Sequence, residues 1–254
     1  GKTTAIRCML DLIRPASGTL RVLGFDPQRD SIAVRSQVGY LPGELHLDDS
    51  FNVLNLFHFY NHFRKQSTNI KRISELAEQL ELALDTPVRN LSKGNKQKVA
   101  VVIALMHQPK LLLLDEPTSG LDPLVQRVTL RLIREAVREG ATVFFSSHVI
   151  SEVQQIATRV GIIRQGYVVE IASTAEITRR SFPKAHIRLS DPTRIEELIK
   201  IPNTTLISRE NEDLVTLRVE GGMDTFIKAL AAFPVYDLDI ERASLEEVFM
   251  HFYG

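Results

Sequence analysis

The sequence predicts an α/β fold, with a parallel sheet covered by helices on both faces and a smaller α+β unit after it. Four consecutive leucines at 111–114, between Pro109 and Pro117, are typical of a strand buried on both faces. Helical and strand-like patterns alternate on either side of this run, as they do in proteins with parallel sheets. After residue 181 the order changes to that of a split βαβ motif, which indicates a second unit.

The first part of the chain is expected to form a helix and two short strands. Apolar side chains recur at helical spacing over residues 5–13, and Pro15 ends this pattern. Residues 18–23 alternate between apolar and polar side chains, which predicts a strand. Residues 37–41 predict a second short strand.

From residue 48 the pattern becomes helical. Residues 51–65 and 71–84 have apolar side chains at helical spacing, and a turn at 85–87 follows. Ser92 stands in position to cap an apolar helix over residues 99–106. The apolar face predicted for the second helix consists of Ile73, Leu76, Ala77 and Leu80.

The leucine strand is followed by a helix, a strand and a hairpin. Asp122 is placed to cap a helix that ends at Glu139. Residues 141–147 predict another buried strand, and His148 comes directly after it. Residues 159–171 have the pattern of a hairpin, and the larger unit is expected to end at about residue 180.

The second unit, residues 181–254, is expected to form a small α+β domain of the split βαβ type. It holds no cluster of catalytic residue types, so regulation or support of a dimer is the expected role. Its predicted strands and helices are, in order, 184–189, 192–200, 204–209, 214–220, 223–233, 235–240 and 244–249.

Composition narrows the class of protein. The 31 basic and 31 acidic residues cancel, so no global field draws the chain to nucleic acid or to an anionic membrane. The single cysteine, Cys8, excludes a disulfide within the chain and suits a reducing compartment. No stretch approaches the roughly 18 apolar residues that a membrane span needs. These features predict a globular protein of the cytoplasm that does not bind nucleic acid.

Two carboxylates at the end of the leucine strand are the first candidates for chemistry. The carboxyl ends of parallel strands are where ligands bind in open α/β sheets. Asp115 offers Mg²⁺ a hard oxygen ligand, and Glu116 is free to act on water. A buried strand that is stopped by a solvated acidic turn would also explain the pair. The motifs on either side favour the chemical interpretation.

The start of the chain carries part of a phosphate-binding motif. Gly1, Lys2 and Thr3, followed by Thr4, match the last three positions of G-x-x-x-x-G-K-[ST]. Such a triplet can arise by chance, but here it begins a helix, whose free N–H groups can hold phosphate. Half a motif at residue 1 and no initiator Met suggest that the chain begins inside this loop, without its first strands.

Two further segments could contact phosphate. Ser92 and Gly94 at a helix start leave a hydroxyl and bare N–H groups facing outward, although a plain helix cap has the same sequence. His148 stands at the same predicted sheet edge as the acidic pair. A contact of this histidine with phosphate is therefore favoured over a surface or packing role.

Over residues 1 to about 180, these motifs resemble the ATP-binding subunit of ABC transporters. The resemblance implies a P-loop NTPase core with a helical subdomain at about 48–108, followed by a ferredoxin-like domain over 181–254. It identifies the Gly-Lys-Thr-Thr segment as the end of the Walker A motif and the leucine strand as Walker B. It further implies ATP and Mg²⁺ as ligands, Thr3 and Asp115 as metal ligands, Glu116 as the residue that acts on the attacking water, and His148 as the switch histidine.

The same resemblance implies a composite site between two ATPase subunits. Residues 91–97 resemble the family's signature, in which Ser92 and Gly94 contact the γ-phosphate of ATP held by the opposite subunit. Residues 119–122 resemble the D-loop, which crosses the dimer. The nucleotide-binding residues implied are Gly1, Lys2, Thr3, Thr4, Ser92, Gly94, Gln97 and Asp122.

The chain also departs from the family's pattern. Lys93 stands where a second glycine is common, and Asn95-Lys96 precedes Gln97, a variant that resembles drug and antibiotic exporters. Gly43, followed by Glu44, stands where the family usually has the Q-loop glutamine.

The expected function is an ATP-hydrolysing subunit that powers export through a separate membrane permease. It would act as a head-to-tail homodimer or heterodimer, peripheral on the inner face of the cell membrane. One alternative is a soluble ABC ATPase that acts on nucleic acid or ribosomes. However, the chain has no long heptad insert and only one ATPase half. Another alternative is that this chain, with its partial Walker A motif, is a non-hydrolysing interaction protein.

A surface for the permease is expected at the loop 43–46 and the aromatic helix after it. That helix carries Phe57, Phe59, Tyr60 and Phe63, more rings than a single buried face accommodates. The alternative is that most of these rings belong to the core.

We expect residues 1–254 alone to bind ATP weakly, because most N–H groups of a complete phosphate-binding loop would precede Gly1. Isothermal titration calorimetry checks this expectation. A micromolar dissociation constant for this chain would contradict it.

Overall fold

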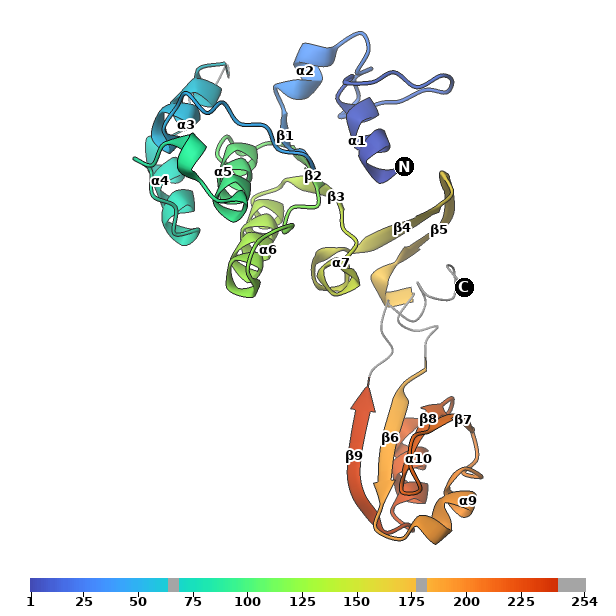
Figure 1. The fold of residues 1–254 in the computed structure, drawn as a ribbon. Helices are drawn as coiled ribbons and strands as arrows, with labels where there is room; N and C mark the ends of the chain where they lie inside the picture. The colour runs from blue at the N-terminus through green and yellow to red at the C-terminus, as the bar shows by residue number, and fades with distance from the viewer. Residues whose placement is uncertain (64–68, 177–181, 242–254) are drawn as a thin grey trace. The chain divides into compact units, whose positions relative to one another are not determined.

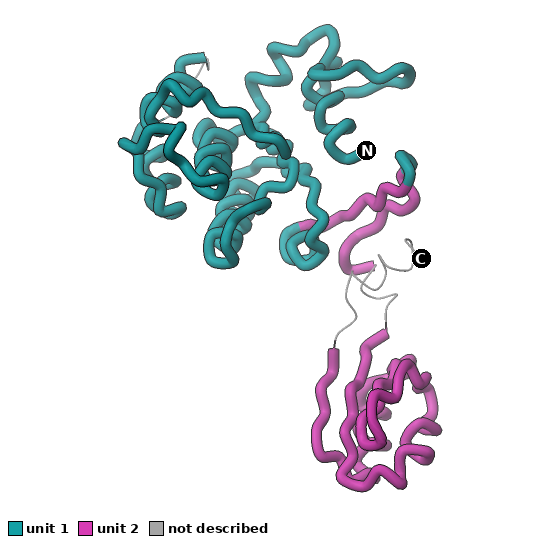
Figure 2. The backbone as a smooth tube through the Cα atoms, in the orientation of Figure 1, with its two compact units in different colours: residues 1–156, 165–167 teal, residues 157–164, 168–254 magenta. Residues whose placement is uncertain are grey.

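The computed structural model describes residues 1–63, 69–176 and 182–241, which belong to two compact units (Figure 2). The first unit comprises residues 1–156 and 165–167. The second comprises residues 157–164 and 168–254.

The first unit is built on a three-stranded parallel sheet (Figure 1). Its strands are β1 (Val38–Leu41), β2 (Leu111–Asp115) and β3 (Thr142–Ser146), in the order β1-β2-β3. Because all three strands run in one direction, their carboxyl ends lie at the same edge of the sheet. The predicted parallel sheet is therefore present.

Helices cover both faces of this sheet. Leu112 and Leu114 of β2 join the apolar cluster formed with α5 and α6, whereas Leu111 and Leu113 join the cluster formed with α1. The leucine strand is thus buried on both faces, as its sequence predicted. The helices are α1 (Lys2–Met9), α2 (Ser31–Arg35), α3 (Val53–His62), α4 (Ile70–Gln79), the 3-10 helix η1 (Val88–Asn90), α5 (Lys93–Leu105), α6 (Pro123–Arg138) and α7 (Ile150–Ile156).

The packing of α5 on the sheet depends on a glycine in β1. A Cβ atom on Gly39 would lie 2.2 Å from the carbonyl oxygen of Ala104 and 2.8 Å from a methyl group of Leu112. No other residue can occupy this position without moving the α5 backbone away from the strand. Gly39 therefore sets how closely α5 approaches the sheet.

Local capping explains where the longer helices begin. In each case a side-chain oxygen accepts a hydrogen bond from a backbone N–H two or three residues later, as helix caps do. Ser92 and Asp122 cap helices, as the sequence predicted, although the helix that follows Ser92 begins at Lys93 rather than at residue 99. Among the described residues of the first unit, caps of this type are Asn52 on α3, Asn69 on α4, Ser92 on α5 and Asp122 on α6.

The strand predicted at residues 18–23 is wrong. Val22 and Phe25 form only an isolated pair, with backbone hydrogen bonds of 2.9 and 3.0 Å. Leu23 and Gly24, with φ of 52° and 86°, form the tight turn between them. Alternating side chains do not make a strand unless a second strand is available to pair with it.

Two other predicted elements have different limits or burial. The helix predicted to reach Leu84 ends at Gln79, because Glu81 has a φ of 51° and the next N–H bonds back to the carbonyl of Ala77. Strand β3 is less buried than predicted, and Phe144 is 43% exposed, because β3 lies at the edge of the three-stranded sheet. The last residues of the helix predicted over 51–65 lie outside the described residues.

The second unit contains a hairpin and a four-stranded antiparallel sheet. In the sheet, β8 lies between β7 and β6, and β9 pairs with the other side of β6. Helix α10 contributes Phe226 to the apolar core of this sheet. The elements are β4 (Arg159–Arg164), β5 (Tyr167–Ser173), β6 (Lys184–Leu189), the 3-10 helix η2 (Pro192–Arg194), α9 (Ile195–Leu198), β7 (Thr204–Arg209), β8 (Leu214–Val219), α10 (Met223–Leu230) and β9 (Val235–Glu241). The closing helix predicted over 244–249 lies outside the described residues.

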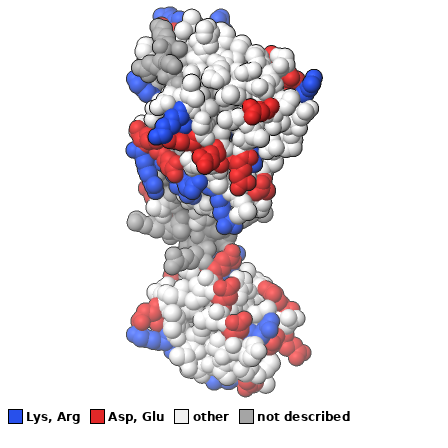
Figure 3. Space-filling model, turned by 90° about the vertical axis from the view of Figure 1, so that its left-hand side faces the viewer, with Lys and Arg blue, Asp and Glu red and all other residues white. Residues whose placement is uncertain are grey.

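The surface carries charges of both signs. Acidic and basic side chains are interspersed on the face drawn in Figure 3. Within the described part of the chain, no helix combines the length and the apolar character that crossing a membrane requires.

We expect Gly39→Ala to lower the free energy of unfolding by about 3 kcal/mol, because the added methyl group overlaps the α5 backbone. Gly161→Ala is the matched control, since a Cβ atom there meets no heavy atom within 4 Å. Its effect should stay within about 1 kcal/mol. Urea unfolding followed by circular dichroism measures both variants, and equal losses would contradict the role of Gly39.

Candidate functional site

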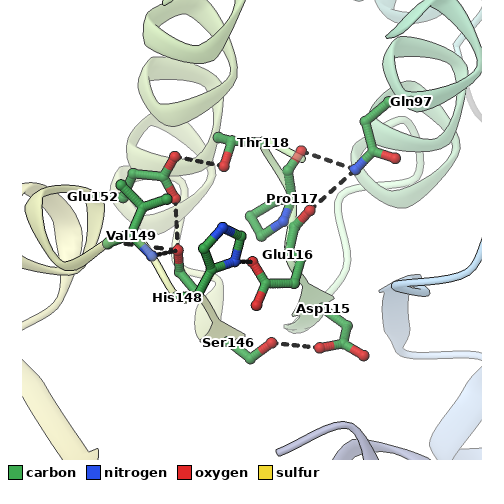
Figure 4. A network of polar contacts seen from close by, with 10 residues as sticks. Gln97, Asp115, Glu116, Pro117, Thr118, Ser146, His148, Val149 and Glu152 are labelled. Atoms are coloured by element: carbon green, nitrogen blue, oxygen red, sulfur yellow. Dashed lines mark hydrogen bonds and ion pairs between the residues drawn. The ribbon is translucent and has the colours of Figure 1, made fainter. Parts of the chain in front are cut away.

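The acidic pair lies at the carboxyl edge of the parallel sheet, as predicted (Figure 4). Asp115 is the last residue of β2, and the register of the sheet pairs it with Ser146, the last residue of β3. The Ser146 hydroxyl donates a hydrogen bond to Asp115 Oδ1, and both residues are buried. This bond fixes the orientation of the Asp115 carboxylate.

The second oxygen of Asp115 faces a glycine of the neighbouring loop. A Cβ atom on Gly43, two residues after β1, would lie 3.0 Å from Asp115 Oδ2. Because Gly43 has no side chain, this oxygen is left available to a ligand. Tyr40 of β1 also belongs to these surroundings, since burial and then the charge of Asp115 raise the pKa of its phenol.

Glu116 has an unusual backbone conformation. Its φ is 53°, a left-handed value that costs a residue other than glycine about 1 to 3 kcal/mol. Three hydrogen bonds hold it there. Its N–H donates to the carbonyl of Ser146 at 3.1 Å, and its own carbonyl accepts from the N–H of Ser119 at 3.1 Å and from Gln97 Nε2 at 3.2 Å. The surrounding structure therefore determines where this carboxylate points.

Glu116 and His148 are in direct contact. Glu116 Oε2 lies 2.6 Å from His148 Nδ1, although the two residues are 32 positions apart in the sequence. An ionised carboxylate only accepts hydrogen bonds, so Nδ1–H is the donor. The two side chains are thus joined by one short hydrogen bond at the sheet edge.

Gln97 supports the loop that follows β2. Its side chain is buried, and Nε2 donates to the carbonyls of Glu116, at 3.2 Å, and Pro117, at 3.1 Å. Helix α5, which carries Gln97, is therefore linked directly to the backbone of the acidic pair. In this structure the amide nitrogen of Gln97 binds the chain's own carbonyls.

Ser92 and Gly94 lie at the start of α5. The Ser92 hydroxyl accepts a hydrogen bond from the Asn95 N–H at 3.2 Å, so Ser92 caps the helix. A Cβ atom on Gly94 would lie 3.1 Å from the carbonyl oxygen of Gly120. The start of α5 and the loop after β2 are thus in close contact within one chain.

Asp122 ends the loop after β2 and caps α6. Its Oδ1 accepts hydrogen bonds from the N–H groups of Leu124, at 3.0 Å, and Val125, at 3.1 Å. The Val125 bond is the largest cause of a lowered pKa for this carboxyl. Asp122 is exposed, and it fixes the turn between the loop and the helix.

Lys2, Thr3 and Thr4 form the first turn of α1, and Gly1 precedes it. Ile6 belongs to the apolar cluster that joins α1 to β2, so this helix start is fixed relative to the leucine strand. Among residues 1–63, 69–176 and 182–241, no hydrogen bond or ion pair links these three residues to the acidic pair. The structure therefore joins Asp115 to Ser146 and Glu116 to His148, but leaves the start of α1 without a direct bond to either pair.

Four polar residues of this region carry no prediction from the sequence. Ser146 orients Asp115, while Thr118 and Ser147 both bond to the buried carboxylate of Glu152. A usable signal was the Ser-Ser pair directly before His148 at a strand end. Nothing in the local pattern marked Glu152 as buried.

Among the residues that the structure describes, no group of three or more His, Cys, Asp or Glu side chains could hold a metal ion. At the carboxyl edge of the sheet, Asp115 is a carboxylate whose orientation is fixed by a strand partner.

A parallel sheet with a helix-start Gly-Lys-Thr segment and an acidic pair at its carboxyl edge defines an α/β protein of the P-loop NTPase type. Residues 1–119 match the family described as ABC transporter. The ABC transporter ATP-binding protein NatA of Bacillus subtilis is 36% identical over 174 residues, which cover 66% of this chain and 71% of that protein. The daunorubicin resistance ATP-binding protein DrrA3 of Streptomyces coeruleorubidus is 29% identical over 267 residues, which cover 100% of this chain and 84% of that protein.

A solved structure of the ATP-binding subunit of an ABC transporter is similar as well. Its TM-score is 0.66 at 26% sequence identity, and the match covers 71% of this chain and 77% of the other. The chain therefore belongs to the ATP-binding subunits of ABC transporters, and it is an ATPase. A soluble ABC ATPase that acts on nucleic acid or ribosomes is not favoured by these relatives.

Proposed function

We propose that this ATPase subunit powers export through a separate membrane permease, and that Glu116 and His148 carry out the hydrolytic step. The observation that carries the proposal is the 2.6 Å contact between these two side chains, next to the buried Asp115, at the carboxyl edge of the sheet. Export is supported by the name of another relative, the Nod factor export ATP-binding protein I of Cupriavidus metallidurans.

The residues present fit a Mg²⁺ ion held together with ATP. Mg²⁺ usually takes one or two protein carboxylates and otherwise binds phosphate oxygens and water. Asp115 has one oxygen bonded to Ser146 and the other facing the bare backbone of Gly43, so it suits this role. Thr3 would supply a hydroxyl. When bound, Mg²⁺ neutralises charge on the β- and γ-phosphates.

The first turn of α1 would hold the phosphates. Lys2 would contact the β- and γ-phosphates, and the N–H groups of residues 1–4 would contribute at a positively polarised helix start. Gly1 and Thr4 would belong to this phosphate-binding segment.

Glu116 would orient and deprotonate the attacking water. Its backbone is held by three hydrogen bonds, so the carboxylate reaches the reaction already positioned. His148 would hold the γ-phosphate and keep the carboxylate in place through Nδ1. In phosphoryl transfer, positioning and charge stabilisation account for most of the catalysis.

A second subunit would complete each site. In a head-to-tail homodimer or heterodimer, the start of α5 would face the γ-phosphate held by the opposite subunit. Ser92 and Gly94 would contact this phosphate, and Gln97 follows them in the same helix. The positive end of the 13-residue helix α5 supports an anion there. Asp122, at the end of the loop after β2, would lie at the same interface.

The permease-facing surface would include the outer rings of α3. Phe57 is fully buried and belongs to the core, whereas Phe59 and Phe63 are 42% and 71% exposed. Their ring centroids lie 5.0 Å apart, so they form one exposed aromatic pair. Such a pair suits an interface with another protein. The subunit would then be cytoplasmic and peripheral on the inner face of the membrane.

The two parts of the chain would have different roles. Residues 1–180 would form the ATPase domain, with a helical subdomain at about 48–108, and residues 181–254 a ferredoxin-like domain for regulation or dimer support. The strand order β7-β8-β6-β9 supports this assignment, because a split βαβ domain inserts its third strand between the first two.

A full-length Ser92→Arg protein should bind ATP as a monomer but neither dimerise nor hydrolyse it, because the arginine would block the composite site. Ser74→Arg, at an exposed position of α4, is the control and should behave as the parent does. Gel filtration with ATP and phosphate release measure the two properties. Parental turnover in Ser92→Arg would exclude the composite site.

Glu116→Gln should lower turnover about 100-fold or more, because the amide keeps the shape of the side chain but cannot take a proton. ATP should still close the dimer of this variant.

Asp115→Asn should instead weaken the Mg²⁺-dependent binding of ATP. His148→Ala should reduce turnover and leave ATP binding largely intact. Phosphate release beside gel filtration separates these outcomes. If Glu116→Gln hydrolyses ATP at the parental rate, Glu116 is not the catalytic base.

A further inference from the structure

Glu152 of α7 is a buried carboxylate with two hydroxyl partners. Its exposure is 4%, and both oxygens accept hydrogen bonds: Oε1 from Thr118 Oγ1 at 2.6 Å and Oε2 from Ser147 Oγ at 2.8 Å. Burying a carboxylate is costly unless its oxygens are satisfied, and bonds to an ionised group are stronger than neutral ones. The two hydroxyl groups are therefore held firmly.

The two partners of Glu152 belong to the two loops that carry the reacting side chains. Thr118 follows Glu116 by two residues in the loop after β2, and Ser147 directly precedes His148 after β3. With the contact between Glu116 and His148, these bonds close a ring between the loops (Figure 4).

The hydroxyl of Ser147 has a fixed role in this ring. It accepts a hydrogen bond from the Val149 N–H at 3.0 Å while it donates to Glu152. Through the Ser147 hydroxyl, the backbone before and after His148 is thus connected to the carboxylate of Glu152. No ion pair joins Glu152 to a basic side chain within the described ranges, so hydroxyl groups alone supply its partners.

We propose that Glu152 is a positioning residue for ATP hydrolysis, which keeps His148 in contact with Glu116 by tying Ser147 to Thr118. This inference rests on the proposed function of the Glu116 and His148 pair. Neither Glu152 nor Thr118 is assigned a contact with nucleotide. Loss of the ring should therefore slow the chemical step without changing ATP binding.

The matched pair Thr118→Val and Thr129→Val tests the ring. Both substitutions replace a buried threonine hydroxyl by a methyl group of similar shape. Thr118 donates to Glu152, whereas the Thr129 hydroxyl has no hydrogen-bond partner in the described structure. Thr118→Ser, which keeps the donor, is the rescue variant.

The first readout is the nuclear magnetic resonance signal of the His148 ring nitrogens in the protein without ATP, assigned with His148→Gln. In Thr118→Val the signals should move toward those of Glu116→Ala, in which the contact is lost. They should stay at the wild-type position in Thr118→Ser and Thr129→Val. Unchanged signals in Thr118→Val would overturn the proposal, whatever the ATPase activity of the protein.

The second readout is steady-state ATP hydrolysis by the full-length protein. In Thr118→Val, kcat should fall about tenfold with KM for ATP unchanged, as expected for a misplaced catalytic group. Glu152→Gln should keep much of the activity, because the amide oxygen can still accept one of the two hydrogen bonds and the amide nitrogen can donate the other. Shifted ring signals with an unchanged kcat would overturn the link to hydrolysis. By contrast, parental turnover in Glu116→Gln would contradict the proposed function itself, so the two failures are distinguishable.

Discussion

The parallel pairing of β2 with β1 and β3 is the constraint on which the site depends. The register sets Asp115 opposite Ser146, so the loops after β2 and β3 leave the sheet side by side and bring Glu116 to His148. A slip by one residue would reverse the faces of a strand and separate these pairs. The leucines of β2 are apolar on both faces and do not distinguish one register from the next. The polar pair at the end of the strands supplies a specific contact in the observed register.

The site is held by buried polar groups that all have partners. Gln97 binds the carbonyls after β2, Ser146 binds Asp115, and Glu152 joins the two loops. This arrangement allows Glu116 to keep a left-handed backbone, which isolated residues other than glycine avoid. Three hydrogen bonds of the Glu116 N–H and carbonyl offset the free-energy cost of that conformation. If Glu116 acts on the attacking water as proposed, a carboxylate held in this way loses little entropy when substrate binds.

The close approach of α5 to the sheet connects the helical part of the first unit with the site. Gly39 allows the helix backbone to contact β1, and Gln97 then reaches the loop after β2 from the same helix. At the start of α5, Gly94 touches Gly120 of that loop. A shift of α5 would therefore act on the loop at two points. The helical part of the first unit and the loop of the acidic pair are therefore linked by two contacts of α5.

Sequence alone determined the features that depend on neighbouring residues. Apolar spacing placed the leucine strand and most of the longer helices, although it did not predict the short helices α2 and α7. Ser92 and Asp122 mark helix starts because capping joins groups two or three residues apart. The strand predicted at 18–23 failed because a strand needs a partner that periodicity does not reveal. Tertiary structure alone decided the contacts of Ser146 and Glu152, which join residues 31 and 34 positions apart. Such pairs depend on the register of the sheet and the packing of α7, and neither leaves a local pattern in the chain.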